Sequence, residues 1–318
     1  MTDWRARDRS TLHRIASTHQ TGLELTLRQR GQGAPVLFVH GATFSGRLYD
    51  IPHPGVNWLQ AVADAGFSGY AVDVRGYGLS KPAAFPDGPY ARATEAVEDI
   101  ADAVDWIAAR HGGGPVALVG WSWGTITTSL FVAGRGRGRV SALVLYAPIY
   151  AETNAGWIDL LADPADRSRL RPFGPWRRVD LSETRARWDA QLPPGANWRS
   201  ESVLQAMIAS SLADDPEADA TDPPSFRVPN GTLVDLWECF NGRPIHDPSA
   251  IDCPTFLIRG TQDPTATRSD ALAILDRLAS DDRAYVEIAG GTHFINAETR
   301  APVLFDHVNG FLRRTAGE

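Results

Sequence analysis

Cysteine and long apolar runs are both scarce in this 318-residue chain, and each scarcity excludes a class of protein. The two cysteines, Cys239 and Cys253, lie in neither a CxxC nor a Cys/His spacing, so we expect no disulfide framework and no metal site. The longest apolar stretch, VSALVLYAPIYA, is far shorter than the roughly 18 to 20 residues of a membrane span. The charged first residues also lack the apolar segment of a signal peptide. We therefore expect a cytoplasmic protein without a membrane partner.

Clustered positive charge is also missing. The formal net charge is −7, and Lys81 is the only lysine among 31 basic residues, which we interpret as a bias of genome composition. Because no basic block interrupts the sequence, nucleic acid is not an expected partner. With 43% hydrophobic residues, the chain is long enough to bury the core of one large domain.

What the sequence does contain is an alternation of short apolar runs with helical patterns. The valine-rich runs PVLFVHG, GYAVDV and PVALVGW are closed by Gly or Asp, which is typical of buried parallel strands. Between the last two, apolar residues recur at steps of three and four, as in an amphipathic helix: Val97, Ile100, Val104 and Ile107. Further strands are expected at VSALVLYAP, CPTFLIRG and AYVEIAG. The pattern predicts an α/β fold with a mostly parallel central sheet flanked by helices.

The alternation stops at residue 150 and resumes at residue 251. The segment 150–250 has no apolar run of strand type, and it holds many prolines and five of the ten tryptophans. We predict that 150–250 is an inserted, mainly helical cap, and that 1–149 and 251–318 form one core domain. The polar stretch ADDPEADATDPPS within it is expected to be a flexible lid edge.

The sequence GWSWG at 120–124 is a GxSxG motif between a predicted strand and a predicted helix. Gly120 and Gly124 lack a Cβ, which allows strand and helix to approach closely while Ser122 adopts a strained conformation that exposes its hydroxyl. Taken alone, the motif also fits a turn serine that caps a helix. A catalytic serine additionally needs a base and an acid.

His293 and Asp263 are the candidates for these two roles. His293 follows the last predicted strand, in YVEIAGGTHF, and Asp263 follows the preceding strand, in FLIRGTQDPT. Pro264 favours an extended backbone at Asp263, consistent with a loop residue at a strand end. Together with Ser122 they occur in the chain order nucleophile, acid, base. We therefore predict a catalytic triad of Ser122, Asp263 and His293.

With these motifs in place, the chain from about residue 21 resembles the α/β-hydrolase fold family. HGAT after the strand VLFV resembles the oxyanion loop of that family, DVRGYGLS resembles its DxRGxGxS segment, and the interruption at 150–250 lies where the family carries its cap. The resemblance implies an oxyanion hole formed by the backbone N–H groups of Ala42 and Trp123. It implies an acyl-enzyme on Ser122 and requires no cofactor or metal. His40 and Arg75 are expected to have structural roles.

The predicted function is hydrolysis of a carboxylic ester or lactone of a small apolar or aromatic molecule. A serine at 122 argues against haloalkane dehalogenases and epoxide hydrolases, which use an aspartate nucleophile. A proline-iminopeptidase-like activity and carbon–carbon hydrolysis stay open, although HGATFSG replaces the HGGPG of the first group and SWGT replaces the SMGG of the second. A hydrolase-fold ligand-binding protein of the receptor type also stays open, since such a protein can keep its triad.

The substrate pocket is expected to be apolar, with Phe44, Tyr49 and Trp123 among its lining residues. Several arginines of the cap could attract a substrate carboxylate or phosphate, but we favour a solvated cap face for them. These are Arg167, Arg169, Arg171, Arg177, Arg178, Arg185 and Arg187. The expected partner is a small-molecule substrate, and the protein is expected to be a monomer or a homodimer.

Overall fold

The computed structural model describes residues 10–316, within which eight strands form one sheet in the order β1-β2-β4-β3-β5-β6-β11-β12. The strands β1 and β2 run antiparallel to their neighbours, and every pair from β4 to β12 is parallel. This confirms the mostly parallel sheet predicted from the sequence. The strand bounds are β1 (Thr11–Ala16), β2 (Glu24–Arg30), β3 (Pro35–Val39), β4 (Ser68–Asp73), β5 (Val116–Trp121), β6 (Val140–Tyr146), β11 (Thr255–Gly260) and β12 (Arg283–Ile288).

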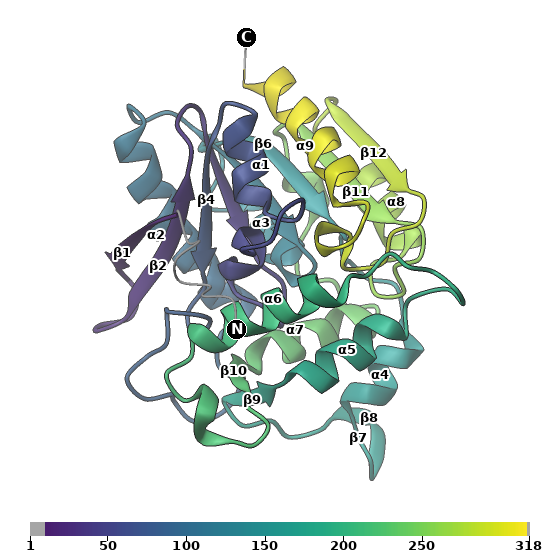
Figure 1. Ribbon diagram of the computed structural model, residues 1–318. Helices are drawn as coiled ribbons and strands as arrows, with labels where there is room; N and C mark the ends of the chain where they lie inside the picture. The colour runs from purple at the N-terminus through teal and green to yellow at the C-terminus, as the bar shows by residue number, and fades with distance from the viewer. Residues whose placement is uncertain (1–9, 317–318) are drawn as a thin grey trace.

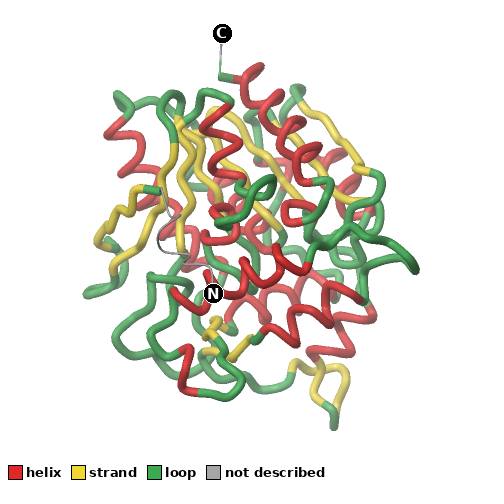
Figure 2. Tube along the Cα trace, in the orientation of Figure 1, coloured by secondary structure: helices red, strands yellow, loops and turns green. Residues whose placement is uncertain are grey.

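Helices cover both faces of this sheet, so that β5, β6 and β11 are buried almost throughout (Figures 1 and 2). The helices α1 and α9 lie on one face, and α2, α3 and α8 lie on the other (Figure 1). Their bounds are α1 (Trp58–Asp64), α2 (Ala93–Arg110), α3 (Trp123–Ala133), α8 (Arg268–Arg277) and α9 (Ala301–Thr315). Parallel strands buried on both faces explain the nearly continuous apolar runs in the sequence.

An aromatic cluster fills the core between the sheet and its first helix. Trp58 of α1 stacks on Phe305 of α9 with 4.8 Å between ring centroids, and it also contacts Phe38, Tyr49 and Tyr146. All five side chains are at most 4% exposed. Burying aromatic rings of this size contributes strongly to stability, and edge-to-face pairs add about 0.5 to 1.5 kcal/mol each.

The chain between β6 and β11 forms a separate group of elements at the carboxyl ends of the parallel strands (Figure 1). Its helices are α4 (Ala155–Leu161), α5 (Leu181–Asp189), α6 (Glu201–Ala213) and α7 (Gly231–Phe240). Two short antiparallel strand pairs accompany them, β7 (Ala162–Asp163) with β8 (Asp166–Leu170), and β9 (Trp176–Val179) with β10 (Phe226–Pro229).

These strand pairs are absent from the sequence-based description of a mainly helical insertion. The sequences DRSRL of β8 and WRRV of β9 are too polar to give the apolar run by which a buried strand is recognised. Their pairing depends on partners elsewhere in the chain, which a local pattern does not contain. Between residues 10 and 316, no helix is long and apolar enough to cross a membrane.

Candidate active site

Ser122 occupies a sharp turn between β5 and α3. Its backbone has φ 57° and ψ −122°, a conformation that non-glycine residues rarely adopt. A Cβ on Gly120 would lie 2.4 Å from the Gly124 carbonyl oxygen, and a Cβ on Gly124 would lie 2.3 Å from the carbonyl oxygen of Val39. Both glycines are therefore needed for the close approach of strand and helix. The Ser122 side chain makes no capping hydrogen bond to α3, so the interpretation as a helix cap is wrong.

The three residues of the predicted triad are joined by two hydrogen bonds. His293 Nε2 lies 2.9 Å from Ser122 Oγ, and His293 Nδ1 lies 2.7 Å from Asp263 Oδ2. The second oxygen of Asp263 accepts from the backbone N–H groups of Thr265 at 2.8 Å and Ala266 at 2.9 Å. Because this carboxylate acts only as an acceptor, Nδ1 carries the ring proton, and Nε2 is free to accept a proton from the serine.

The loop that carries His293 is anchored from three sides. The carbonyl oxygen of His293 accepts from the Trp121 indole at 3.1 Å and from the Tyr146 hydroxyl at 2.9 Å. These two side chains come from the ends of β5 and β6. The backbone N–H of His293 donates to Oε1 of Gln191 at 3.0 Å, a residue that follows α5. The imidazole position is thus fixed by both the sheet and the segment between β6 and β11. No motif in the sequence pointed to Gln191.

The Ala42 backbone, predicted to form an oxyanion hole, is held on both sides by side chains. His40 Nε2 accepts from the Val74 N–H at 3.1 Å, so Nδ1 carries the proton and donates to the Gly41 carbonyl at 2.8 Å. The carbonyl of Ala42 accepts from the Tyr77 hydroxyl at 3.0 Å and from Nη2 of Arg177 at 3.1 Å. Burial lowers the pKa of His40 to about 4, which keeps the ring neutral in this role.

The Ala42 and Trp123 N–H groups have no hydrogen-bond partner within residues 10–316. Trp123 is the first residue of α3, where backbone N–H groups have no acceptor inside the helix. His40 donates to the carbonyl of the same peptide unit that bears the Ala42 N–H, which orients and polarises that group. Both N–H groups therefore lack an acceptor in the described part of the protein, as donors of an oxyanion hole would.

Arg75 has the structural environment expected from the sequence. Its guanidinium donates to the buried carboxylate of Asp99 in α2, with Nη2 2.7 Å from Oδ1. Its backbone N–H also donates to Asp99, at 3.0 Å. The pair ties the segment after β4 to α2 and lies outside the hydrogen bonds of the triad.

A cavity of about 390 Å³ lies between the HGAT loop, α4 and the residues that follow Asp263. Ala42 and Thr43 of the HGAT loop line it, as do Trp157 and Leu161 of α4 and Gln191. The remaining lining includes Pro264 and Thr265, which directly follow the triad aspartate. This volume suits a small molecule, and the mixture of apolar walls with a few polar groups is typical of such sites.

The three aromatic residues predicted to line the pocket do not line this cavity. Tyr49 is fully buried against Phe38 and Trp58, and its hydroxyl donates to the Val39 carbonyl at 2.9 Å. The Trp123 ring is also fully buried, and its N–H donates to Asp235 of α7 at 3.0 Å. Phe44 is 1% exposed and packs against Phe226 and Phe294. These rings therefore pack beneath the loops of the site and do not form its surface.

Six of the seven cap arginines named above divide into two groups, and the seventh, Arg169, is exposed on β8 as expected. Arg171, Arg177 and Arg187 line the cavity of about 390 Å³. Arg171 is exposed, as expected, but Arg177 and Arg187 are partly buried, contrary to the solvated face that we favoured for the whole set. Arg167, Arg178 and Arg185 instead pair with acidic side chains, with Arg178 3.6 Å from Glu217. Members of the two groups are interleaved along the chain, so the sequence position of an arginine does not show to which group it belongs.

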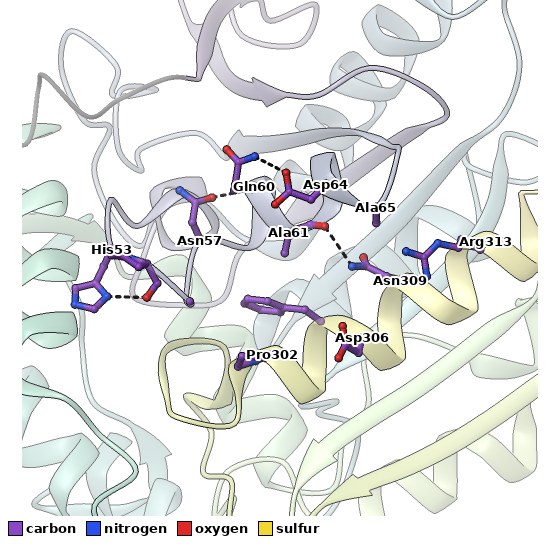
Figure 3. A pocket seen from close by; sticks show the side chains of 13 residues that line it. His53, Asn57, Gln60, Ala61, Asp64, Ala65, Pro302, Asp306, Asn309 and Arg313 are labelled. Atoms are coloured by element: carbon purple, nitrogen blue, oxygen red, sulfur yellow. Dashed lines mark hydrogen bonds between the residues drawn. The ribbon is translucent and has the colours of Figure 1, made fainter.

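A second cavity, of about 450 Å³, lies between α1 and α9 (Figure 3). Its side chains include His53, Gln60 and Asp64 on one wall and Asp306 and Arg313 on the other (Figure 3). None of the triad residues lines this cavity or the one of about 390 Å³. Only the cavity next to Ala42 is lined by Gln191, which binds the His293 backbone, and by the two residues that follow Asp263. That cavity is therefore the candidate binding site. Among residues 10–316, no group of three His, Cys, Asp or Glu side chains is arranged to hold a metal ion.

Comparison with known proteins gives consistent results. Residues 34–299 match the family model of the alpha/beta hydrolase fold. Over 132 residues, 42% of this chain, the sequence is 35% identical to the non-heme chloroperoxidase CPO-A1 of Kitasatospora aureofaciens, and the match spans 43% of that relative. The fold is similar to those of two solved structures. One is a thermophilic esterase from Thermogutta terrifontis, with TM-score 0.65 and 18% identity over 96% of this chain and 99% of that one. The other is a bromoperoxidase from Bacillus anthracis, with TM-score 0.67 and 20% identity over 95% of this chain and 100% of that one.

Proposed function

Since the chain belongs to the α/β-hydrolase fold family and is a hydrolase, we propose that it cleaves a carboxylic ester or lactone of a small molecule through an acyl-enzyme on Ser122. The cavity of about 390 Å³ limits the size of this substrate, and its walls of Trp157, Leu161 and Leu233 suit an apolar or aromatic part.

The observation that carries the proposal is the hydrogen-bonded series Asp263, His293, Ser122, with distances of 2.7 and 2.9 Å. Ser122 Oγ attacks the acyl carbon, and its proton passes to His293 Nε2. Asp263 holds the imidazole in the required tautomer and stabilises the imidazolium that forms.

In the same step, the acyl oxygen becomes negatively charged. The N–H groups of Ala42 and Trp123 stabilise it, and loss of one such donor typically costs about 3 to 4 kcal/mol. His293 then donates its proton to the leaving oxygen, which departs as an alcohol. Water attacks the acyl-enzyme, with His293 as general base, and releases the acid and the free serine.

A fluorophosphonate label tests the serine directly by intact-protein mass spectrometry. The matched control is Ser129→Ala, because Ser129 lies on the same helix and its buried hydroxyl has no hydrogen-bond partner within the described residues. We expect one adduct on the natural protein and on Ser129→Ala, and none on Ser122→Ala. An adduct that persists on Ser122→Ala would contradict the assignment of the nucleophile.

Turnover separates an enzyme from a receptor that retains its triad. The natural protein should complete many cycles on 4-nitrophenyl esters, and Ser122→Ala should not. A single turnover with an adduct on Ser122 would favour the ligand-binding alternative. A panel of esters, lactones and amino-acid amides then distinguishes ester hydrolysis from a proline-iminopeptidase-like activity.

Perhydrolysis is a second candidate, favoured by the 35% identity with a non-heme chloroperoxidase. Hydrogen peroxide would replace water in attacking the acyl-enzyme on Ser122 and would release a peracid. This reaction uses the same serine and histidine, so Ser122→Ala should lose it together with ester hydrolysis. Peracid formation from a carboxylic ester and peroxide, followed by oxidation of bromide, is the measurement.

A further inference from the structure

Two guanidinium groups line the cavity next to the HGAT loop. Arg177 extends from β9 and donates to the Ala42 carbonyl at 3.1 Å, to the Pro229 carbonyl at 3.0 Å and to Asn230 at 3.3 Å. Arg187 extends from α5 and donates to Oγ1 of Thr43 at 3.1 Å. Both side chains are partly buried. Arg177 and Arg187 therefore place two positive charges next to the loop that carries the Ala42 N–H.

Within residues 10–316, neither guanidinium has a carboxylate partner within 4 Å, whereas buried arginines elsewhere in the protein do have one. Arg28 lies 2.6 Å from Asp214, and Arg75 lies 2.7 Å from Asp99. A buried charge is costly unless it is paired and hydrogen-bonded. An anion that enters the cavity would supply the missing partner.

The surroundings of Arg187 strengthen this point. Its guanidinium lies 5.3 Å from the ring centroid of Trp157 and 5.6 Å from that of Phe294, so aromatic rings flank it on two sides. Burial, with the charge of Arg177 adding to it, lowers the pKa of Arg187 to about 10. Burial also lowers the pKa of Arg177. Both shifts have the direction expected where burial disfavours the charged form of a side chain.

The other charged side chains of the cavity are Arg171 and Glu183. Glu183 is exposed at the cavity rim, and its charge offsets one of the three guanidinium groups. The remaining excess of positive charge attracts an anionic group of the substrate. A planar carboxylate also matches the planar fork of an arginine.

We propose that Arg177 and Arg187 bind a free carboxylate of the substrate, so that the enzyme acts on esters or lactones that carry a second, ionised carboxyl group. The inference rests on the proposed function, because it assigns the substrate class of that same site. Arg177 binds the carbonyl of Ala42, whose N–H is proposed to stabilise the oxyanion. The free carboxylate therefore lies only a few atoms from the bond that is cleaved.

Two aryl esters of nearly the same length test the preference. In mono-4-nitrophenyl glutarate the acyl chain ends in a carboxylate, and in 4-nitrophenyl pentanoate it ends in a methyl group. The measured quantity is the ratio of their kcat/KM values after subtraction of spontaneous hydrolysis. We expect the natural protein to favour the glutarate ester, and Arg187→Gln to lower the ratio by about ten- to a hundredfold, as for loss of a hydrogen bond to a charged group. Arg187→Lys should retain part of the preference, because it keeps the charge without the fork.

The matched control is Arg185→Gln, on the same helix, whose guanidinium pairs with Glu201 outside the cavity. This variant should keep the ratio of the natural protein. An equal ratio in the natural protein, Arg185→Gln and Arg187→Gln would overturn the carboxylate site. The proposed hydrolase function would stand in that case, since both esters would still be cleaved at Ser122.

Calorimetric titration with glutarate, which has no bond to cleave, tests the site without turnover. Glutarate should bind the natural protein, its neutral diamide should not, and Arg187→Gln should weaken glutarate binding at least about tenfold. Equal binding of glutarate and the diamide would contradict the proposal. Inorganic phosphate that binds more tightly than glutarate would also contradict it, in favour of a phosphate-bearing ligand. Glutarate binding without labelling of Ser122 would instead contradict the proposed hydrolysis and leave the carboxylate site in place.

Discussion

His246 offers a sharp test of how burial controls stability in this protein. Its ring is 6% exposed and meets the ring of Tyr150 at a centroid distance of 5.1 Å in an edge-to-face arrangement. Neither ring nitrogen has a hydrogen-bond partner within residues 10–316. Burial lowers the pKa of His246 to about 4, and the nearby carboxylate of Asp247 offsets only part of that effect. The folded protein therefore holds a neutral imidazole under mildly acidic conditions.

The sign of the pH dependence follows from this shift. In the unfolded chain the imidazole has a pKa of about 6.5, so below that pH the unfolded state binds a proton that the folded state does not. The contribution of the neutral His246 ring to the free energy of unfolding is therefore fully present above pH 6.5. It is lost as the pH falls from 6.5 toward 4. A pKa of about 4 in the folded state corresponds to a loss of about 2 kcal/mol at pH 5.

Leucine has a similar volume to histidine and cannot bind a proton. Replacement of His246 by leucine should therefore remove this pH-dependent loss of stability. The free energy of unfolding can be measured by urea titration at pH 7.5 and at pH 5. We expect its decrease between these two pH values to be about 2 kcal/mol smaller in His246→Leu than in the natural protein. His40, whose pKa is also lowered to about 4, contributes to both proteins and cancels in the comparison. Parallel pH profiles for the two proteins would refute the reasoning.

Two further predictions concern the site. Asp263→Asn should lower kcat for 4-nitrophenyl pentanoate by about 10⁴, because the amide would favour the wrong tautomer of His293; a loss smaller than tenfold would count against the triad. The preference for the glutarate ester should decline as the pH rises through about 10, where Arg187 loses its charge, with the pentanoate ester as internal reference. A free arginine would keep its charge to a pH above 12, so a ratio that stays constant up to pH 11 would contradict the role of Arg187.

The sequence was sufficient to predict the fold and the proximity of the three residues proposed as a triad. Ser122, Asp263 and His293 each follow a strand of a parallel sheet, and the carboxyl ends of such strands lie on one edge, so residues far apart in the chain come together there. The glycines at 120 and 124 also indicated the turn, because only a residue without a Cβ fits between strand and helix.

The lining of the cavity was not predictable in this way. Tyr49 is close in sequence to the HGAT loop, yet its ring points into the core, since proximity along the chain does not fix the direction of a side chain. Arg177 and Arg178 are neighbours on β9, and successive side chains of a strand point to opposite faces. Arg177 binds Ala42, and Arg178 pairs with Glu217. Which of these two arginines faces the Ala42 loop depends on the position of β9 in the folded protein, which the sequence pattern does not contain.

Three contacts described above have a consequence for protein engineering. Gln191 binds the backbone of His293, Arg177 binds that of Ala42, and Asp235 binds the indole of Trp123. All three partners come from residues 150–250, which a designer would treat as a cassette that can be exchanged to change substrate range. A chimera that imports a foreign cassette without equivalents of these side chains would change selectivity and weaken the catalytic loops at once. Grafting must therefore transfer the loop contacts together with the pocket.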